Sequence, residues 1–175
     1  MHDAQNLEFS RIDKALIIAA WDLLDLCKAK GLTIVTAESC TGGLVAAALT
    51  DAPGASKVVD GGFVTYSNEA KQACLKVPKE LLDRHGAVSE PVARAMAEGA
   101  LAASPADLAV SITGIAGPEG GTAEKPVGLV HFAAARRGGP TIHREKRFGD
   151  TGRGQVRRDA AMEAIALLTE IAKLR

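Results

Sequence analysis

Two adjacent side chains that could act as nucleophiles, Ser39 and Cys40, lie in the stretch TAESCTGG at residues 36–43. An apolar, β-branched run precedes this stretch and a helix-forming run follows it, so the pair is predicted to lie where a strand turns into a helix. The start of a helix has unpaired backbone N–H groups and a positive dipole end, and Gly42 and Gly43 permit a close approach of the backbone. The turn therefore predicts a site for an oxyanion or a phosphate, or else a simple serine cap of the helix.

Such a nucleophile needs a base, and no histidine is predicted to lie near enough to the turn to serve as one. The four histidines are predicted to lie in the N-terminal segment, at a helix end and in two hairpin strands far from the turn: His2, His85, His131 and His143. A G-x-S-x-G elbow is also absent, because Ala37 and Thr41 occupy its glycine positions. Lys71 is the better candidate, since burial and the start of its helix would both lower its pKa. The phenol of Tyr66 could relay a proton from Ser39 to Lys71, although each of these two residues alone is more often structural.

A long loop follows a third predicted strand, which ends at Thr113. Its thirteen residues, 114–126, include four glycines and two prolines, whereas most connections within a domain have about 4 to 6 residues. Gly114, Gly117 and their neighbours can offer backbone N–H groups to a phosphate, and the Thr113 hydroxyl could bind substrate or Ser39. The loop is neither a P-loop nor a G-x-G-x-x-G fingerprint, and no Cys, His and carboxylate cluster has metal-ligand spacing. We therefore expect no cofactor and no metal.

The elements that must position these residues follow from the hydrophobic periodicity. Helices are predicted at residues 10–30, 42–50, 67–75, 78–85, 90–103 and 155–174, and strands at 32–37, 57–67, 107–113, 127–135 and 141–148. The alternation of strands and helices predicts a single domain over residues 1–175, an α/β fold with a three-layer α/β/α sandwich and a mixed, partly parallel sheet. Ligands bind beyond the carboxyl ends of parallel strands, so the three loops that follow these strands should share one cleft.

The composition limits the classes of partner. Lys and Arg number 21, as do Asp and Glu, and only 3% of the residues are aromatic, so neither nucleic acid nor a membrane surface is expected as a partner. Eight cationic residues lie between positions 136 and 158, where an anionic ligand could bind or a solvated face could form. Three cysteines without paired spacing and the lack of a signal pattern favour the cytoplasm. A homo-oligomer is expected, with a dimer as the commonest form.

Three segments of the chain resemble one known family. The stretches TAESCTGGLVAAALTDAPGASKVVDGGFVTYSNEAK, LL..HGAVSEPVA and SITGIAGPEGGT..KPVGLV are similar to the C-terminal domain of the competence/damage-inducible protein CinA, over nearly the whole chain. Family members of this size are nicotinamide-nucleotide amidohydrolases, which convert nicotinamide mononucleotide to nicotinate mononucleotide and ammonia. Longer members carry an additional N-terminal domain, for which we expect no room in 175 residues.

The resemblance implies a serine nucleophile at Ser39, with Tyr66, Lys71 and Thr113 completing the catalytic group. It also implies an arginine for the substrate phosphate, Arg153 or Arg157, of which we favour Arg153 because it lies just outside the last predicted helix. The expected substrate-binding residues are Glu38, Thr41, Gly42, Gly43, Gly114, Gly117 and Arg153. Glu38 could bind the ribose hydroxyls or satisfy a neighbouring helix end. The competing functional hypothesis is a non-catalytic nucleotide-binding or regulatory module linked to competence or DNA damage.

Overall fold

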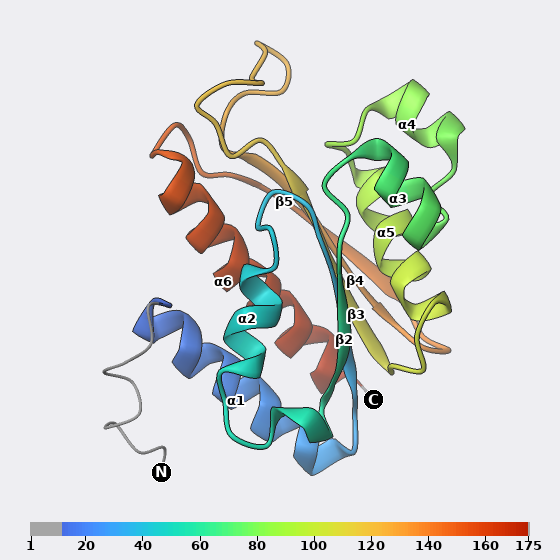
Figure 1. The fold of residues 1–175 in the computed structure, drawn as a ribbon, viewed down its shortest axis with the longest axis vertical. Coiled ribbons are helices and arrows are strands. Elements are labelled where there is room, and N and C mark those ends of the chain that lie inside the picture. The colour runs from blue at the N-terminus through green and yellow to red at the C-terminus, as the bar shows by residue number, and fades with distance from the viewer. Residues whose placement is uncertain (1–11, 175) are drawn as a thin grey trace.

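The computed structural model describes residues 12–174, and one five-stranded sheet lies at its centre (Figure 1). The strand order is β2-β1-β3-β4-β5. The strands are β1 (Ile34–Glu38), β2 (Val59–Val64), β3 (Leu108–Gly114), β4 (Leu129–Arg136) and β5 (Thr141–Arg147). β2, β1 and β3 run parallel, whereas β4 pairs antiparallel with β3 and β5 pairs antiparallel with β4. The predicted mixed sheet and its terminal hairpin are therefore confirmed.

Helices cover both faces of this sheet (Figure 1). They are α1 (Lys14–Lys30), α2 (Leu44–Thr50), the short 3₁₀ helix η2 (Ala55–Lys57), α3 (Asn68–Leu75), α4 (Lys79–His85), α5 (Glu90–Ala102) and α6 (Arg153–Lys173). One apolar cluster packs α1, α2 and α6 against one face, and a second packs α3, α4 and α5 against the other. This arrangement is the predicted three-layer α/β/α sandwich.

The central strand β3 shows why the sequence folds in this way. Leu108, Val110 and Ile112 belong to the cluster on the α6 side, while Ala109 belongs to the cluster on the α5 side. Side chains of a strand point alternately to its two faces, so a strand with helices on both sides is apolar along most of its length. The polar exceptions on the α5 side are Ser111, whose hydroxyl donates to the Ala93 carbonyl at 2.5 Å, and Thr113.

Two predicted boundaries shift in ways that affect the nucleophile turn. β1 extends to Glu38, one residue beyond the predicted end, and α2 begins at Leu44 rather than near Gly42. The start of the first helix was predicted at Ser10, which lies outside the described residues. The described helix α1 begins at Lys14, and Asp13 is its N-cap. β2 is irregular near its glycine pair, because the register with β1 shifts between Val59 and Gly61.

The parallel arrangement brings three chain segments to one edge of the sheet. β1, β2 and β3 end there at Glu38, Val64 and Gly114, and the segments that follow them are those predicted to form a shared cleft. Of the helices in residues 12–174, none combines the length and the apolar character that crossing a bilayer requires.

Candidate active site

A cavity of about 200 Å³ opens at this edge of the sheet. The predicted site residues that line it are Ser39, Tyr66, Lys71, Thr113, Gly114 and Arg153. They come from the ends of the three parallel strands, from α3 and from the first residue of α6. The structure thus brings together residues up to 114 positions apart, from Ser39 to Arg153.

Lys71 is the most unusual side chain of this cavity, because it is only 1% exposed and is one of the largest fully buried side chains. Its Nζ lies 3.1 Å from Ser39 Oγ, 2.8 Å from the Thr65 carbonyl oxygen and 3.2 Å from the Tyr66 carbonyl oxygen. Burial lowers the pKa of Lys71, which favours the neutral amine. A neutral amine has two N–H groups for the two carbonyls and one lone pair, which can accept the proton of the Ser39 hydroxyl.

The position of Tyr66 differs from the predicted proton relay. Its side chain is 60% exposed, and its hydroxyl accepts a hydrogen bond of 3.0 Å from Arg153 Nη2. Lys71 contacts Ser39 without an intermediate group, and it uses the backbone carbonyl of Tyr66 rather than the phenol. The sequence does not show that Lys71 contacts Ser39 directly. Helical spacing places Lys71 near the end of β2 but does not fix how far its amine reaches.

Ser39 and Cys40 have different surroundings, although both line the cavity. The Ser39 N–H donates to the Ile112 carbonyl at 3.0 Å, which fixes the turn against β3 and leaves the hydroxyl beside Lys71. Cys40 packs into the apolar cluster on the α6 side, and burial raises the pKa of its thiol to about 12. A thiol with so high a pKa is not ionised near neutral pH and is a poor nucleophile.

The two turn glycines do not offer their N–H groups to the cavity, contrary to the prediction. The Gly42 N–H donates to the Ser39 carbonyl at 3.0 Å, and the Gly43 N–H donates to a Glu38 carboxylate oxygen at 3.0 Å. Their φ angles are +62° and +93°, a region in which only glycine is unstrained. Gly42 and Gly43 therefore shape the turn, and any oxyanion donor must be another group.

Glu38 is a buried cap for α2 rather than a ribose ligand. Its carboxylate accepts hydrogen bonds from the N–H groups of Gly43, Val45 and Ala46 at 3.0, 3.1 and 2.9 Å. The side chain is fully buried, so no ribose hydroxyl can reach it. The alternative in which Glu38 satisfies a neighbouring helix end is therefore correct.

We expect Glu38→Gln to destabilise the protein by about 1 to 3 kcal/mol, because an amide has one acceptor oxygen and presents an N–H₂ group to the remaining donors. Urea unfolding should show a lower midpoint with an unchanged slope. Glu80→Gln in the exposed first turn of α4 is the control and should unfold like the wild type. Unchanged stability of Glu38→Gln would refute the capping role.

The two candidate arginines have separate contacts. Arg153 Nη1 donates to the Gly117 carbonyl at 3.0 Å, so Gly117 offers its oxygen to this arginine. Arg157 lies one turn further along α6, and its Nη2 donates to the Thr41 carbonyl at 2.8 Å, which braces the nucleophile turn. Thr41 is fully buried and does not line the cavity, so its predicted contact with substrate is not supported by the geometry. Arg153 is the arginine beside the cavity.

Thr113 also has a specific partner. Its hydroxyl donates to the Ala87 carbonyl at 2.8 Å and so links β3 to the segment before α5. This hydroxyl therefore donates to Ala87, a residue that sequence reasoning did not single out, and not to Ser39, while its predicted contact with substrate stays a prediction. Ala87 and its neighbour Val88 line the same cavity.

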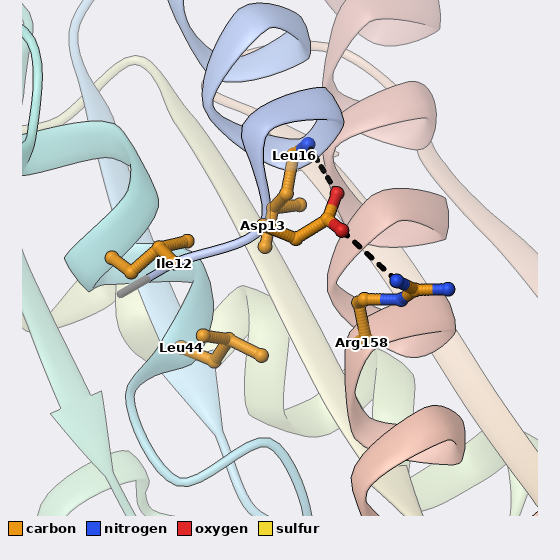
Figure 2. Close-up of a pocket in the computed structure, with 5 residues that line it drawn as sticks. All are labelled: Ile12, Asp13, Leu16, Leu44 and Arg158. Carbon is orange, nitrogen blue, oxygen red and sulfur yellow. Dashed lines mark hydrogen bonds and ion pairs between the residues drawn. The ribbon is translucent and has the colours of Figure 1, made fainter. Parts of the chain in front are cut away.

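Most of the cationic residues between positions 136 and 158 lie in ion pairs or against carbonyls. Arg144, for example, donates to Glu163 and Glu170. Arg158 donates to Asp13 at 2.9 Å beside a second cavity, which apolar side chains also line (Figure 2). For the residues in ion pairs the solvated-face interpretation is correct, and among the eight only Arg153 lines the active-site cavity.

Of the four histidines, His2 lies outside the described residues, and the three within residues 12–174 do not line the cavity. One of them nevertheless lies closer to it than predicted. His131 on β4 pairs in register with Thr113, yet its Nδ1 lies 3.0 Å from His143 Nε2. Glu145 and Glu90 lie at the outer ring nitrogens of this pair, at 3.8 and 3.4 Å. The shared face of the two histidines on a hairpin could have been read from the sequence. Within residues 12–174, no group of three or more candidate ligands is arranged to hold a metal ion.

Several known proteins are similar to this chain in sequence. A protein from Escherichia coli K12 named nicotinamide-nucleotide amidohydrolase PncC is 56% identical over 142 residues, which are 81% of this chain and 85% of that protein. A putative competence-damage inducible protein from Symbiobacterium thermophilum is 58% identical over 146 residues. These residues are 79% of this chain and 34% of that protein, so the chain spans about a third of the length of such relatives.

Solved structures and a family model agree with this similarity. The crystal structure of a competence/damage inducible protein from Agrobacterium tumefaciens superposes with a TM-score of 0.92 at 47% identity and covers 94% of this chain and 100% of that chain. A CinA superfamily protein from Escherichia coli superposes with a TM-score of 0.84 at 33% identity and covers 99% of this chain and 100% of that chain. The model of the CinA C-terminal domain matches residues 19–172. The chain therefore belongs to the CinA C-terminal domain family.

Proposed function

We propose that this chain hydrolyses the carboxamide of nicotinamide mononucleotide, releasing nicotinate mononucleotide and ammonia. The observation that carries the proposal is the buried contact between Lys71 Nζ and Ser39 Oγ at 3.1 Å. A serine hydroxyl becomes a useful nucleophile when a neighbouring base takes its proton, and an amine with a lowered pKa is such a base. The 56% identity to a relative named for this reaction supports the choice of substrate.

The reaction would proceed in two steps through an acyl-enzyme. Ser39 Oγ attacks the carboxamide carbon while its proton passes to Lys71 Nζ. The Lys71 ammonium group then gives this proton to the leaving nitrogen of the carboxamide, so the C–N bond breaks and ammonia departs. A water molecule then attacks the ester carbon, gives a proton to Lys71 and releases the carboxylic acid, and Ser39 regains its proton from Lys71.

The substrate phosphate would bind beside Arg153. This residue begins α6, whose first turn carries no acidic side chain and whose N-cap is Gly152, which has no side chain to accept from the first N–H groups. Its backbone N–H groups and positive dipole end therefore favour an anion, and the Arg153 guanidinium adds a fixed pair of donors. Tyr66 lies beside this guanidinium and helps to orient it.

The test is to incubate the purified protein with nicotinamide mononucleotide and to measure ammonia together with nicotinate mononucleotide. Stoichiometric formation of both products is expected. Binding of the mononucleotide without release of ammonia would reject the proposal and favour a nucleotide-binding module.

We expect Arg153→Lys to raise KM for the mononucleotide by about 10- to 100-fold with a smaller effect on kcat, since losing one charge-assisted hydrogen bond costs about 1.5 to 3 kcal/mol. Nicotinamide riboside, which lacks the phosphate, should be a correspondingly poor substrate of the wild type. Arg158→Lys, which changes an arginine outside the cavity, is the matched control. Equal use of riboside and mononucleotide would contradict the assignment of Arg153.

A further inference from the structure

One side of the active-site cavity is lined by Ala87 and Val88, which lie between α4 and α5. We term residues 85–88, the last residue of α4 and the three residues after it, the wall segment. Each of its four carbonyl groups accepts a hydrogen bond from a side chain outside the segment. The carbonyls of His85 and Val88 accept from Lys125 Nζ at 2.6 and 2.8 Å. The Gly86 carbonyl accepts from Ser89 Oγ at 2.9 Å, and the Ala87 carbonyl accepts from Thr113 Oγ1 at 2.8 Å. Such a segment depends on its side-chain partners, because these four bonds are not part of helix or sheet ladders.

Lys125 supplies two of these four bonds and comes from the long loop between β3 and β4. Its own backbone is fixed by Thr122, whose hydroxyl accepts from the Lys125 N–H at 3.0 Å and whose N–H donates to the Lys125 carbonyl at 2.8 Å. The same loop holds Arg153 through the Gly117 carbonyl. The loop therefore connects the wall segment to Arg153, which lines the same cavity.

The end of α4 explains why a cation suits this position. His85 is the last residue of α4, so its carbonyl lies at the negative end of the helix dipole and has no partner within the helix. Gly86 follows with a φ of +72°, and a Cβ atom at this position would lie 3.1 Å from Lys125 Nζ. Glycine at position 86 thus allows both the turn of the backbone and the close approach of the lysine.

We propose that Lys125 is a positioning residue, which holds the wall segment in place so that Ala87 and Val88 keep the cavity shaped for its substrate. Lys125 does not line the cavity itself, so it acts only through the wall segment. The part of this inference that concerns substrate affinity rests on the proposed function. Loss of Lys125 should therefore weaken binding more than it slows the chemical step at Ser39.

The experiment compares Lys125→Met with Lys30→Met by hydrogen exchange and by steady-state kinetics. Lys30 is a matched control, because its Nζ also donates to a distant carbonyl, that of Ala172 at 2.7 Å, but it joins α1 to the end of α6. In Lys125→Met, amide exchange of Gly86, whose N–H donates to the Leu82 carbonyl at 2.9 Å, should rise about tenfold or more. KM should rise about tenfold with kcat within about threefold, as expected for loss of hydrogen bonds from a charged donor. Lys30→Met should change neither quantity.

The separate readouts keep the inference falsifiable. Unchanged exchange of the Gly86 amide in Lys125→Met would overturn it, and so would faster exchange with an unchanged KM. If the wild type released no ammonia, the proposed function would fail, while exchange would still decide whether Lys125 holds the wall segment. As a second variant, Gly86→Ala places a methyl group against Nζ, and its effect on exchange should be less than additive with that of Lys125→Met.

Discussion

Lys71→Met is expected to lower kcat for nicotinamide mononucleotide by about 100- to 10,000-fold, the range typical for loss of a general base. Methionine fills a similar volume but can neither accept the Ser39 proton nor return it to the leaving nitrogen. The variant should remain folded by circular dichroism. Lys79→Met, which changes an exposed lysine of α4, is the control and should retain full turnover. Turnover at the wild-type level in Lys71→Met would exclude the amine as the base.

The pH profile of the wild type gives an independent check of this prediction. The amine accepts a proton only when it is neutral, so the rate should fall as pH falls through the lowered pKa of Lys71. Between this pKa and the ordinary value of 10.5, the unfolded chain binds more protons at Lys71 than the folded protein does, so the Lys71 contribution to stability rises with pH in this window. Both pH dependences should disappear in Lys71→Met.

Tyr66→Phe distinguishes direct proton transfer from a relay through the phenol. Because Lys71 contacts Ser39 directly, removal of the Tyr66 hydroxyl should leave kcat within about tenfold of the wild type, far less than the effect of a missing general base. The lost hydrogen bond to Arg153 should appear instead as a modest rise in KM. A fall in kcat as large as that of Lys71→Met would instead support proton transfer through the Tyr66 phenol.

Ser39→Ala is expected to lower turnover by at least about 1,000-fold, because the nucleophile of a covalent mechanism cannot be replaced by its neighbours. Cys40→Ala should retain turnover within about fivefold, since a buried thiol whose pKa is about 12 is not ionised near neutral pH. It removes one buried sulfur and should cost about 1 kcal/mol of stability. Ammonia release by the two purified, folded variants is the direct comparison.

Thiol alkylation of the wild type supports the same distinction. Cys74 is exposed, whereas Cys27 and Cys40 are buried, so a soluble alkylating reagent should modify Cys74 first and leave activity intact. Peptide mass mapping identifies the modified position. Loss of activity in Cys40→Ala, together with an active Ser39→Ala, would reverse the assignment of the nucleophile.

The fold could be predicted because its signals are local. Short apolar runs mark buried strands such as β3, helical spacing marks α1 and α6, and parallel pairing then places three strand ends at one edge. The convergence of Ser39, Lys71 and Thr113 follows from this topology, since each lies at or just after one of these strand ends.

The contacts within the site could not be predicted, because they depend on distances between side chains. Sequence does not reveal that Glu38 occupies the N–H groups of α2, or that Tyr66 turns toward Arg153 rather than Ser39. Lys125 escaped notice for a related reason, since its partners His85 and Val88 lie 40 and 37 residues away. Only the packing of the long loop beside the end of α4 brings them together.

The environment of Lys71 also limits which substitutions this position tolerates during evolution. The amine satisfies the carbonyl groups of Thr65 and Tyr66, and an apolar replacement would leave both without this donor. Leaving a buried carbonyl unpaired costs about 1 to 3 kcal/mol, which offsets the relief of removing a buried amine. An apolar replacement therefore gains little stability, and we expect related chains that have lost the serine at position 39 to retain the lysine.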